Sequence, residues 1–421
     1  MALLTLAYAL SYVDRTIILL LVGPIRADLQ ISDTQFSLLH GLAFAILYTV
    51  VGIPIGVLAD RHNRPRIIAV GIALWSLMTA LCGTARNFAH LFAARVGVGI
   101  GEAALSPAAY SLITDLAPKH QVGRALGAYG AGVYLGIGAT FLVGGWLVDA
   151  LVARGGFDWW MLEGLAPWQQ VFVLVGVAGL PVALATLLML PEPRRRAQQH
   201  GLSRSAALGP YLRRNWRFIA ALFLGFSFIS LLFNGFLAWL AEYYLRAHGW
   251  SKSRTGVWIG LIMLSAGPLG MAAGGWLTDV WRRRRPVTAP VHVGLWGAVA
   301  LLPWPLWATV VDSPELSLAG ITPIIFFSCF CFGPAVTAIQ LTTPPDLRAR
   351  LSAVYLFVVN LAGIGLGGTA IAFVSDHVLR DETRIGGAMA IVGTTAVVFG
   401  VASLWLAKAA AERLYERAPL E

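Results

Sequence analysis

Two pairs of charged residues stand inside stretches of the chain that are otherwise apolar. Asp14 and Arg15 are adjacent in the first such stretch, and Arg95 and Glu102 are seven residues apart in the fourth. Seven residues make about two helical turns, so Arg95 and Glu102 share one helix face about 10 Å apart. Charges at membrane depth are costly and usually face an aqueous cavity or one another. These four residues therefore predict that the protein transports a substrate across a membrane.

A buried carboxylate beside an arginine can carry a proton. Burial favours its neutral form, whereas a neighbouring cation favours its charged form. An arginine that moves between two carboxylates, or onto a substrate anion, changes which acid holds the proton. We expect Asp14 and Glu102 to be the proton sites and Arg95 to be the switch. Arg15 is either a ligand for an anionic headgroup or a structural partner, and the alternative for the whole cluster is a permanent ion-pair network.

The second half of the chain has no charge in the middle of a predicted span, and its deep polar groups are modest. A cavity between the halves would then be charged on one wall and apolar on the other. Such a cavity suits an amphiphile with an ionic head and a hydrocarbon tail, and it also suits a small anion held by the first half alone. The residues expected to bind substrate are Arg15, Arg95, Glu102, Asn234 and Asn360.

The composition places the chain among helical membrane proteins. Hydrophobic residues make up 57% of the 421 residues and charged residues 12%, whereas soluble domains carry about 25% charged residues. Apolar windows recur that are long enough to cross the ~30 Å hydrocarbon core as helices. They are continuous rather than alternating, which argues against an outer-membrane barrel. The twelve predicted spans are 1–24, 35–60, 66–86, 88–114, 122–150, 168–190, 215–245, 254–280, 287–311, 317–341, 348–375 and 385–409.

Basic residues are unequally distributed over the predicted loops. With both termini in the cytoplasm, the inside loops hold 21 of the 31 Lys and Arg residues and the outside segments hold 8. This bias follows the positive-inside rule, so we expect a multi-pass protein of the cell (inner or plasma) membrane with cytoplasmic termini. We also expect the protein to be a monomer. The net charge of +10 then follows from this topology. The expected partner of the basic loops is the layer of anionic headgroups of the lipid bilayer. No folded basic face for a nucleic acid is predicted.

The two halves of the chain, on either side of the basic stretch 191–214, carry similar motifs. The segment 56–60 ends the second span, the similar segment 275–279 ends the eighth, and arginines follow both. Two similar six-helix halves are the architecture of alternating-access transporters. We expect an all-α membrane protein with an N-terminal six-helix bundle over 1–190, a cytoplasmic basic linker over 191–214 and a pseudo-symmetric C-terminal bundle over 215–421.

No motif for cofactor or metal chemistry occurs in the sequence. Cys82, Cys329 and Cys331 form no metal-ligand pattern with a histidine, and there is no phosphate-binding loop or nucleophile elbow. A large soluble nucleotide domain is also missing, so the energy must come from an ion gradient or from the substrate gradient. We expect no cofactor, no metal and no enzymatic activity.

The loop after the second predicted span resembles a known signature. Residues 56–66 read GVLADRHNRPR, which is similar to the cytoplasmic loop motif of the major facilitator superfamily. The resemblance implies the fold of that superfamily and a cytoplasmic latch in which Asp60 takes part. An aspartate at a helix C-terminus is unfavourable with the helix dipole, so a partner is expected; the alternative is a solvated loop charge. The residues expected at this cytoplasmic gate are Asp60, Arg61, Arg64, Arg124 and Asp279.

Within this superfamily the chain resembles the spinster family. The resemblance lies in Tyr12–Arg15 of the first span and Arg95–Ala103 of the fourth, and Ile31–Asp33 and Trp75–Leu77 also match the pattern. Spinster proteins are described as transporters of lysolipids and sphingolipid phosphates, so the resemblance implies a lipid-like substrate. The deep charges are also similar to those of the organic anion:cation symporters.

The sequence therefore predicts a secondary transporter that works by alternating access. We expect it to be coupled to protons, by symport or antiport, and to move an amphiphilic anionic substrate such as a lysolipid or a sphingolipid phosphate. One alternative is a proton-coupled symporter of a small organic anion. An alternative from another class is an uncoupled lipid scramblase or a receptor that does not transport.

Overall fold

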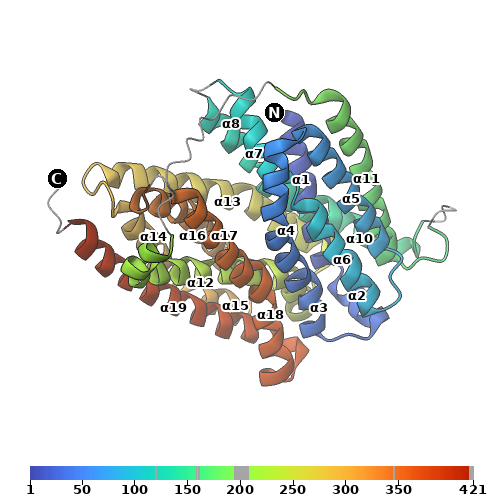
Figure 1. Cartoon of the computed structure of the whole chain (residues 1–421). Helices are drawn as coiled ribbons and strands as arrows, with labels where there is room; N and C mark the ends of the chain where they lie inside the picture. Colours follow the sequence, from blue (N-terminus) through green and yellow to red (C-terminus); the bar gives the residue numbers. More distant parts are fainter. Residues whose placement is uncertain (119–120, 158, 160–161, 194–207, 345–346, 417–421) are drawn as a thin grey trace. The chain divides into compact units, whose positions relative to one another are not determined.

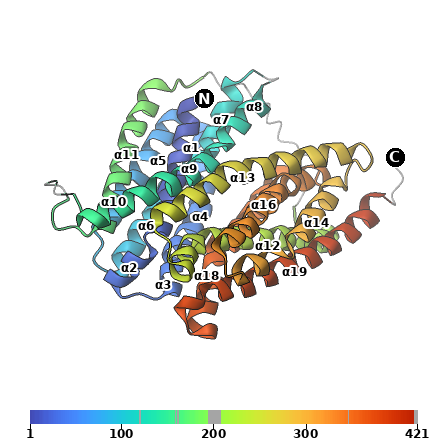
Figure 2. The ribbon, with the colours of Figure 1, turned by 180° about the vertical axis from the view of Figure 1, so that it is seen from behind.

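The described residues are mostly helical, and they form two compact units. The structure is a computed structural model of the whole chain, and it describes residues 1–118, 121–157, 159, 162–193, 208–344 and 347–416. One unit comprises Met1–Gln198 with Leu240–Leu264, and the other comprises Gln199–Trp239 with Ser265–Glu421. Figures 1 and 2 show the helices from opposite sides.

The first unit contains short α, 3₁₀ and π segments as well as long helices. Its elements are α1 Ala2–Thr16, η1 Ile17–Leu20, α2 Val22–Leu29, α3 Asp33–His40, α4 Leu42–Arg61, α5 Arg64–Cys82, α6 Phe88–Glu102, α7 Leu105–Leu116, α8 Val122–Gly130, α9 Gly132–Ala139, η2 Thr140–Gly144, α10 Gly145–Arg154 and α11 Pro167–Met189. In Figures 1 and 2, α5 lies beside α11, which it contacts along its length.

Two long helices contribute to both units. They are α12 Leu208–His248 and α13 Lys252–Arg282, and the turn between them belongs to the first unit. The remaining elements of the second unit are α14 Ala289–Leu301, α15 Trp304–Val310, α16 Pro314–Thr342, α17 Arg348–Asn360, η3 Leu361–Leu366, α18 Gly367–Phe373, η4 Val374–Leu379, η5 Glu382–Arg384, α19 Ile385–Ala411 and η6 Glu412–Glu416.

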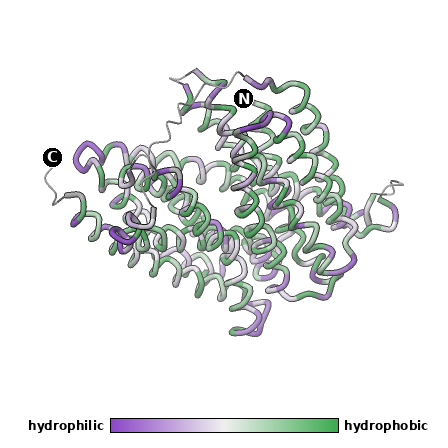
Figure 3. The backbone as a smooth tube through the Cα atoms, viewed as in Figure 1, coloured by the Kyte–Doolittle hydropathy of each residue, from purple (hydrophilic) through white to green (hydrophobic). Residues whose placement is uncertain are grey.

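Twelve helical segments in the described part of the chain are long and apolar enough to cross a membrane, which confirms the predicted all-α fold. The first is Ala2–Leu20 and the last is Glu382–Leu414, each within a few residues of the predicted span. Figure 3 shows apolar residues along the helices and hydrophilic residues mainly at helix ends and in loops. The predicted domain limits at 190 and 215 stay a prediction, and most of the predicted linker lies outside the described residues.

Polar side chains cap the first turns of α3, α5 and α6. At the start of α3, Ser32 and Gln35 form a reciprocal capping box, with N–H to side-chain distances of 3.2 and 3.0 Å. Asn63 Oδ1 accepts a hydrogen bond of 2.9 Å at the start of α5, and Asn87 Oδ1 accepts one of 2.8 Å at the start of α6. These side chains satisfy backbone donors that have no partner inside the helix.

Glycines allow the helices of the first unit to pack closely. A methyl group at Gly136 on α9 would overlap the Ala9 carbonyl oxygen and lie 2.7 Å from Tyr12 Cβ. A methyl group at Gly101 on α6 would lie 2.6 Å from the backbone nitrogen of Trp75. Small residues at such crossings let membrane helices approach one another.

Gly136→Ala is expected to destabilise the protein, because the added methyl group forces α9 away from α1. Overpacking of this kind typically costs about 1–3 kcal/mol. The measurement is the midpoint of thermal unfolding of the purified protein in detergent. Gly127→Ala on α8 is the matched control, since nothing lies within 4 Å of the added group. Equal midpoints for the two variants would contradict the close approach.

Candidate functional site

The charged pair of the first span lies at the end of α1. Asp14 and Arg15 are buried in its last turn, just before the chain tightens into the 3₁₀ segment η1. The Thr16 hydroxyl lies 2.6 Å from the Tyr12 carbonyl oxygen and 2.9 Å from the Thr140 hydroxyl. This contact fixes the end of α1 against η2, and it thereby positions both charged side chains.

Arg15 and Glu102 form a buried ion pair that joins α1 to α6. Arg15 Nη2 donates to Glu102 Oε2 at 2.6 Å, and the side chains are 8% and 1% exposed. The guanidinium carbon lies 4.6 Å from the ring centre of Tyr12, 4.2 Å from that of Phe44 and 5.1 Å from that of Tyr48. Aromatic faces attract a desolvated cation. Arg15 is therefore held by one carboxylate and a group of three aromatic rings.

Arg95 binds the backbone of α1. Its Nη1 donates to the Asp14 carbonyl oxygen at 3.1 Å, and its Nη2 donates to the Arg15 carbonyl oxygen at 3.4 Å. A cation is favourable here because the last carbonyls of a helix lack intrahelical donors and carry its negative dipole end. The expected contact of Arg95 with a carboxylate of Asp14 or Glu102, or with a substrate anion, stays a prediction.

The Asp14 carboxyl is fully buried, and neither of its oxygens has a hydrogen-bond partner among the described residues. The polar groups of Trp75 and Thr79 on α5 lie beside it, but neither meets hydrogen-bond geometry. Glu102 Oε1 also lacks a partner in the described part of the chain. An unpaired charge in a buried site is costly, so the Asp14 carboxyl is chemically suited to bind a proton, whereas Glu102 is paired with Arg15.

His40 belongs to this cluster, although the sequence analysis assigned it no role. It ends α3, it is buried, and its ring experiences the charges of both Arg15 and Arg95. Its Nδ1 has no hydrogen-bond partner among the described residues. A histidine within an apolar stretch was the available signal, but only the packing of α3 against α6 brings it to the arginines.

The two asparagines predicted to bind substrate lie in the second unit, and both are half-buried. Asn234 Nδ2 donates to the Ser230 carbonyl oxygen at 2.9 Å, one turn earlier on α12. Asn360 is the last residue of α17, where the helix widens into the π segment η3 that begins at Leu361. Their expected contact with substrate stays a prediction.

Arg64, predicted at the cytoplasmic gate, is buried in a cluster of ion pairs. Its Nη1 lies 2.6 Å from Asp115 Oδ2, and its Nη2 lies 2.6 Å from Glu192 Oε1. Its backbone N–H also donates to Glu192 Oε2 at 2.6 Å. Arg64 therefore ties the start of α5 to the end of α7 and to the segment after α11. The sequence analysis missed both acids, although each closes a predicted span on the same membrane face as Arg64.

Two other predicted gate residues, Arg61 and Arg124, have no contact with this cluster among the described side chains. Arg61 and Arg124 are exposed, and the Asp60 side chain lies outside the described part of the chain. Asp279 lies 3.7 Å from Arg282 in a local pair, with its side chain 77% exposed. The role of these residues in a cytoplasmic latch stays a prediction.

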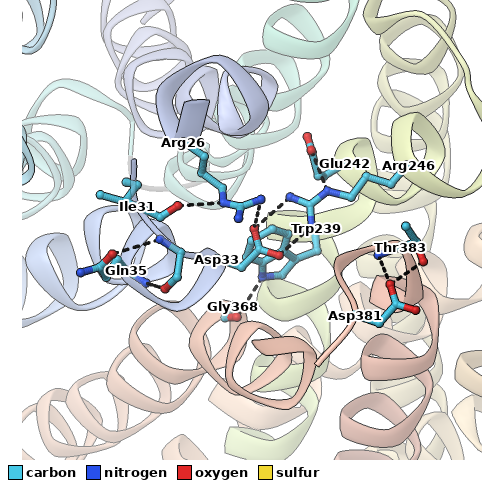
Figure 4. Close-up of polar contacts among 11 residues, drawn as sticks. Arg26, Ile31, Asp33, Gln35, Trp239, Glu242, Arg246, Gly368, Asp381 and Thr383 are labelled. Atoms are coloured by element: carbon cyan, nitrogen blue, oxygen red, sulfur yellow. Dashed lines mark hydrogen bonds and ion pairs between the residues drawn. The ribbon is translucent and has the colours of Figure 1, made fainter. Parts of the chain in front are cut away.

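A second buried ionic network, which we call the Asp33 network, consists of Arg26, Asp33, Glu242 and Arg246. Figure 4 shows Asp33 between the two arginines. Its carboxylate is fully buried and accepts two hydrogen bonds from Arg246, of 2.6 and 2.9 Å, while Arg26 Nη1 lies 3.0 Å away. Arg246 Nε also donates to Glu242 at 2.8 Å. The network joins α2 and α3 to the end of α12.

Twelve apolar spans with ionic clusters buried in one unit define a multi-pass membrane transporter rather than a soluble protein. The family model of the Major Facilitator Superfamily matches residues 4–368. The chain therefore belongs to that superfamily, whose members move small molecules by alternating access.

Similar proteins place the chain close to the spinster family within it. An MFS-type efflux pump of Mycolicibacterium smegmatis is 28% identical over 96% of this chain and 91% of that protein. A probable L-galactonate transporter of Escherichia coli is 26% identical over 66% of this chain and 61% of its own length. The crystal structure of a bacterial homologue of the human lysosomal transporter Spinster, inward-facing and unoccupied, superposes with a TM-score of 0.82. It is 27% identical and covers 100% of this chain and 98% of that one.

Proposed function

We propose that this protein is a proton-coupled transporter of an amphiphilic organic anion, such as a lysolipid or a sphingolipid phosphate. The observation that carries the proposal is the buried Arg15–Glu102 ion pair, which lies beside a second carboxyl without a partner, that of Asp14. The pair provides a guanidinium that can bind a carboxylate or a phosphate through two parallel hydrogen bonds.

Substrate and proton binding are linked through Arg15. A substrate anion that takes the guanidinium displaces Glu102, whose carboxylate then remains buried without a counter-charge. Removing one partner of a buried pair costs about 3–5 kcal/mol, and a proton on the displaced carboxylate relieves that cost. Anion and proton therefore favour each other's binding, which is the property that symport requires.

The second unit supports an amphiphile over a fully polar substrate. Among its described residues, no Asp, Glu, Lys or Arg is buried. Asn234 is half-buried close to paired aromatic rings, with Phe233 and Phe332 in edge contact at 5.6 Å. An apolar chain can be accommodated by such residues without leaving buried charges unpaired.

A small organic anion is the second candidate, and a relative favours it. The name of the probable L-galactonate transporter gives a sugar acid as its substrate. The carboxylate of a sugar acid can bind the Arg15 guanidinium in the same way as a phosphate. The two candidates differ in what the second unit must bind, because a sugar acid needs hydrogen bonds whereas an acyl chain needs apolar contacts.

Transport by the purified protein in proteoliposomes, with a pH-sensitive dye inside the vesicles, tests both proposals. We expect a lysophospholipid or a sphingolipid phosphate to drive proton movement, and we expect Glu102→Gln to lower that movement by at least about tenfold, in line with loss of a proton site. A response to galactonate without a response to either lipid would favour the second candidate. Lipid movement without any proton flux would contradict coupling.

A further inference from the structure

A groove with a volume of about 830 Å³ lies on the second unit, between the start of α12 and the end of α19. Its residues come from the first turns of α12, from the last turns of α19 and from η6. Three arginines of α12 and one of η6 line one part of the groove, and no acidic residue is among its described lining residues. These residues are Arg213, Arg214, Arg217 and Arg413.

Apart from Asn215 and Ser403, the other lining residues of the groove are apolar. Leu224 and Leu406 are half exposed, and Trp216 and Trp405 expose 59% and 60% of their surface. Tryptophans of this kind are enriched where membrane helices meet the headgroup layer. The Arg217 guanidinium carbon lies 5.7 Å from the Trp216 ring centre, so the basic and the aromatic parts are continuous. The groove is thus complementary to an anionic phospholipid. Its basic end suits the headgroup, and its apolar part suits the acyl chains.

We infer that this groove binds a membrane phospholipid whose headgroup carries two phosphates. Guanidinium groups engage phosphate oxygens in pairs, and basic pockets between membrane helices bind such headgroups. No acidic residue of the described lining offsets the positive charge of the four arginines. This charge exceeds the single negative charge of a headgroup with one phosphate, and a headgroup with two phosphates balances more of it. The acyl chains then lie along Leu224 and Leu406, between α12 and α19.

This lipid is a bound component of the protein and not its substrate. The groove belongs to the second unit, whereas the Arg15–Glu102 pair belongs to the first. The inference therefore does not depend on the substrate or on proton coupling, and its test needs no transport activity.

The test is native mass spectrometry of the purified full chain, extracted from vesicles of phosphatidylcholine with added cardiolipin or added phosphatidylglycerol. We expect cardiolipin to be retained in preference to phosphatidylglycerol. The triple variant Arg213→Gln, Arg214→Gln, Arg217→Gln is expected to weaken cardiolipin binding by at least about tenfold, because each arginine near a headgroup adds attraction. Equal retention of the two lipids would overturn the two-phosphate assignment.

Two further variants separate the groove from general surface charge. The control triple variant Arg282→Gln, Arg283→Gln, Arg284→Gln removes the same charge from the end of α13 and the loop after it, and it should leave binding unchanged. Ala409→Phe keeps every arginine but fills the apolar part of the groove, so it should also weaken binding. An equal loss in the control, full binding by Ala409→Phe, or displacement of the lipid by inorganic phosphate would each overturn the inference.

Discussion

Asp14→Asn is expected to abolish proton-driven uptake while the protein remains folded. The Asp14 carboxyl is fully buried, and its oxygens have no hydrogen-bond partner among the described residues. An amide of the same shape therefore breaks no contact that the structure shows. It removes a group that can gain and lose a proton, and driven uptake should fall by at least about a hundredfold, within the usual range for loss of a group that transfers a proton.

The measurement compares two modes of transport in the same proteoliposomes. Uptake driven by a pH gradient should be lost in Asp14→Asn, whereas exchange of labelled for unlabelled substrate at equal pH should survive in part. Asp312→Asn is the matched control, because Asp312 is exposed and lies between α15 and α16. Driven uptake in Asp14→Asn with an unchanged pH dependence would assign the proton to Glu102.

Asp33→Asn is expected to release the end of α12 from α2 and α3. Asp33 is the common partner of two arginines, and both lose their contact with a negative charge at this position when the carboxylate becomes an amide, although Arg246 keeps its pair with Glu242. Removing one partner of a buried ion pair costs about 3–5 kcal/mol. This free energy changes the equilibrium constant between the closed and open contact by more than about a hundredfold. States in which this contact is open should therefore become populated.

Reaction of a thiol placed in the same region reports this opening. Ser37 is buried one turn after Asp33 on α3, and the native cysteines Cys82, Cys329 and Cys331 are also buried. In a Ser37→Cys background, Asp33→Asn should increase the rate of reaction with a membrane-impermeant maleimide. Unchanged labelling would show that the Asp33 network does not control access to α3.

Asp381 provides the control for this experiment. It is an exposed acid before η5, and hydrogen bonds from Thr383 hold the pKa of its carboxyl below the usual range (Figure 4). A lowered pKa means that Asp381 stays charged at neutral pH, so Asp381→Asn also removes one full negative charge. That variant should leave thiol reactivity at position 37 unchanged.

The spans and the deep charges could be predicted because both are local properties of the sequence. A helix that crosses the membrane needs about 20 apolar residues, and a charge within such a window is visible by inspection. Asp14, Arg15, Arg95 and Glu102 were found in this way, and the structure places all of them in one buried region of the first unit.

The pairing of those charges could not be read from spacing. Arg95 and Glu102 share a face of α6, yet Glu102 pairs with Arg15, because the end of α1 brings Arg15 to Glu102 and offers its carbonyls to Arg95. Arg64 and its partner Glu192 are 128 residues apart, and Asp33 and Arg246 are 213 apart. Such pairs depend on how helices cross, which no local pattern in one sequence contains.

The charge sum of the Arg15 cluster determines how membrane voltage acts on the transporter. With both carboxylates ionised, two arginines and two acids sum to zero, so reorientation of the empty cluster moves no net charge. One bound proton leaves a charge of +1, on which a potential acts with about 2.3 kcal/mol per 100 mV. A monovalent substrate anion at Arg15 returns the sum to zero. The loaded form is then electrically silent, and voltage acts only on a protein that carries either the proton alone or the substrate anion alone.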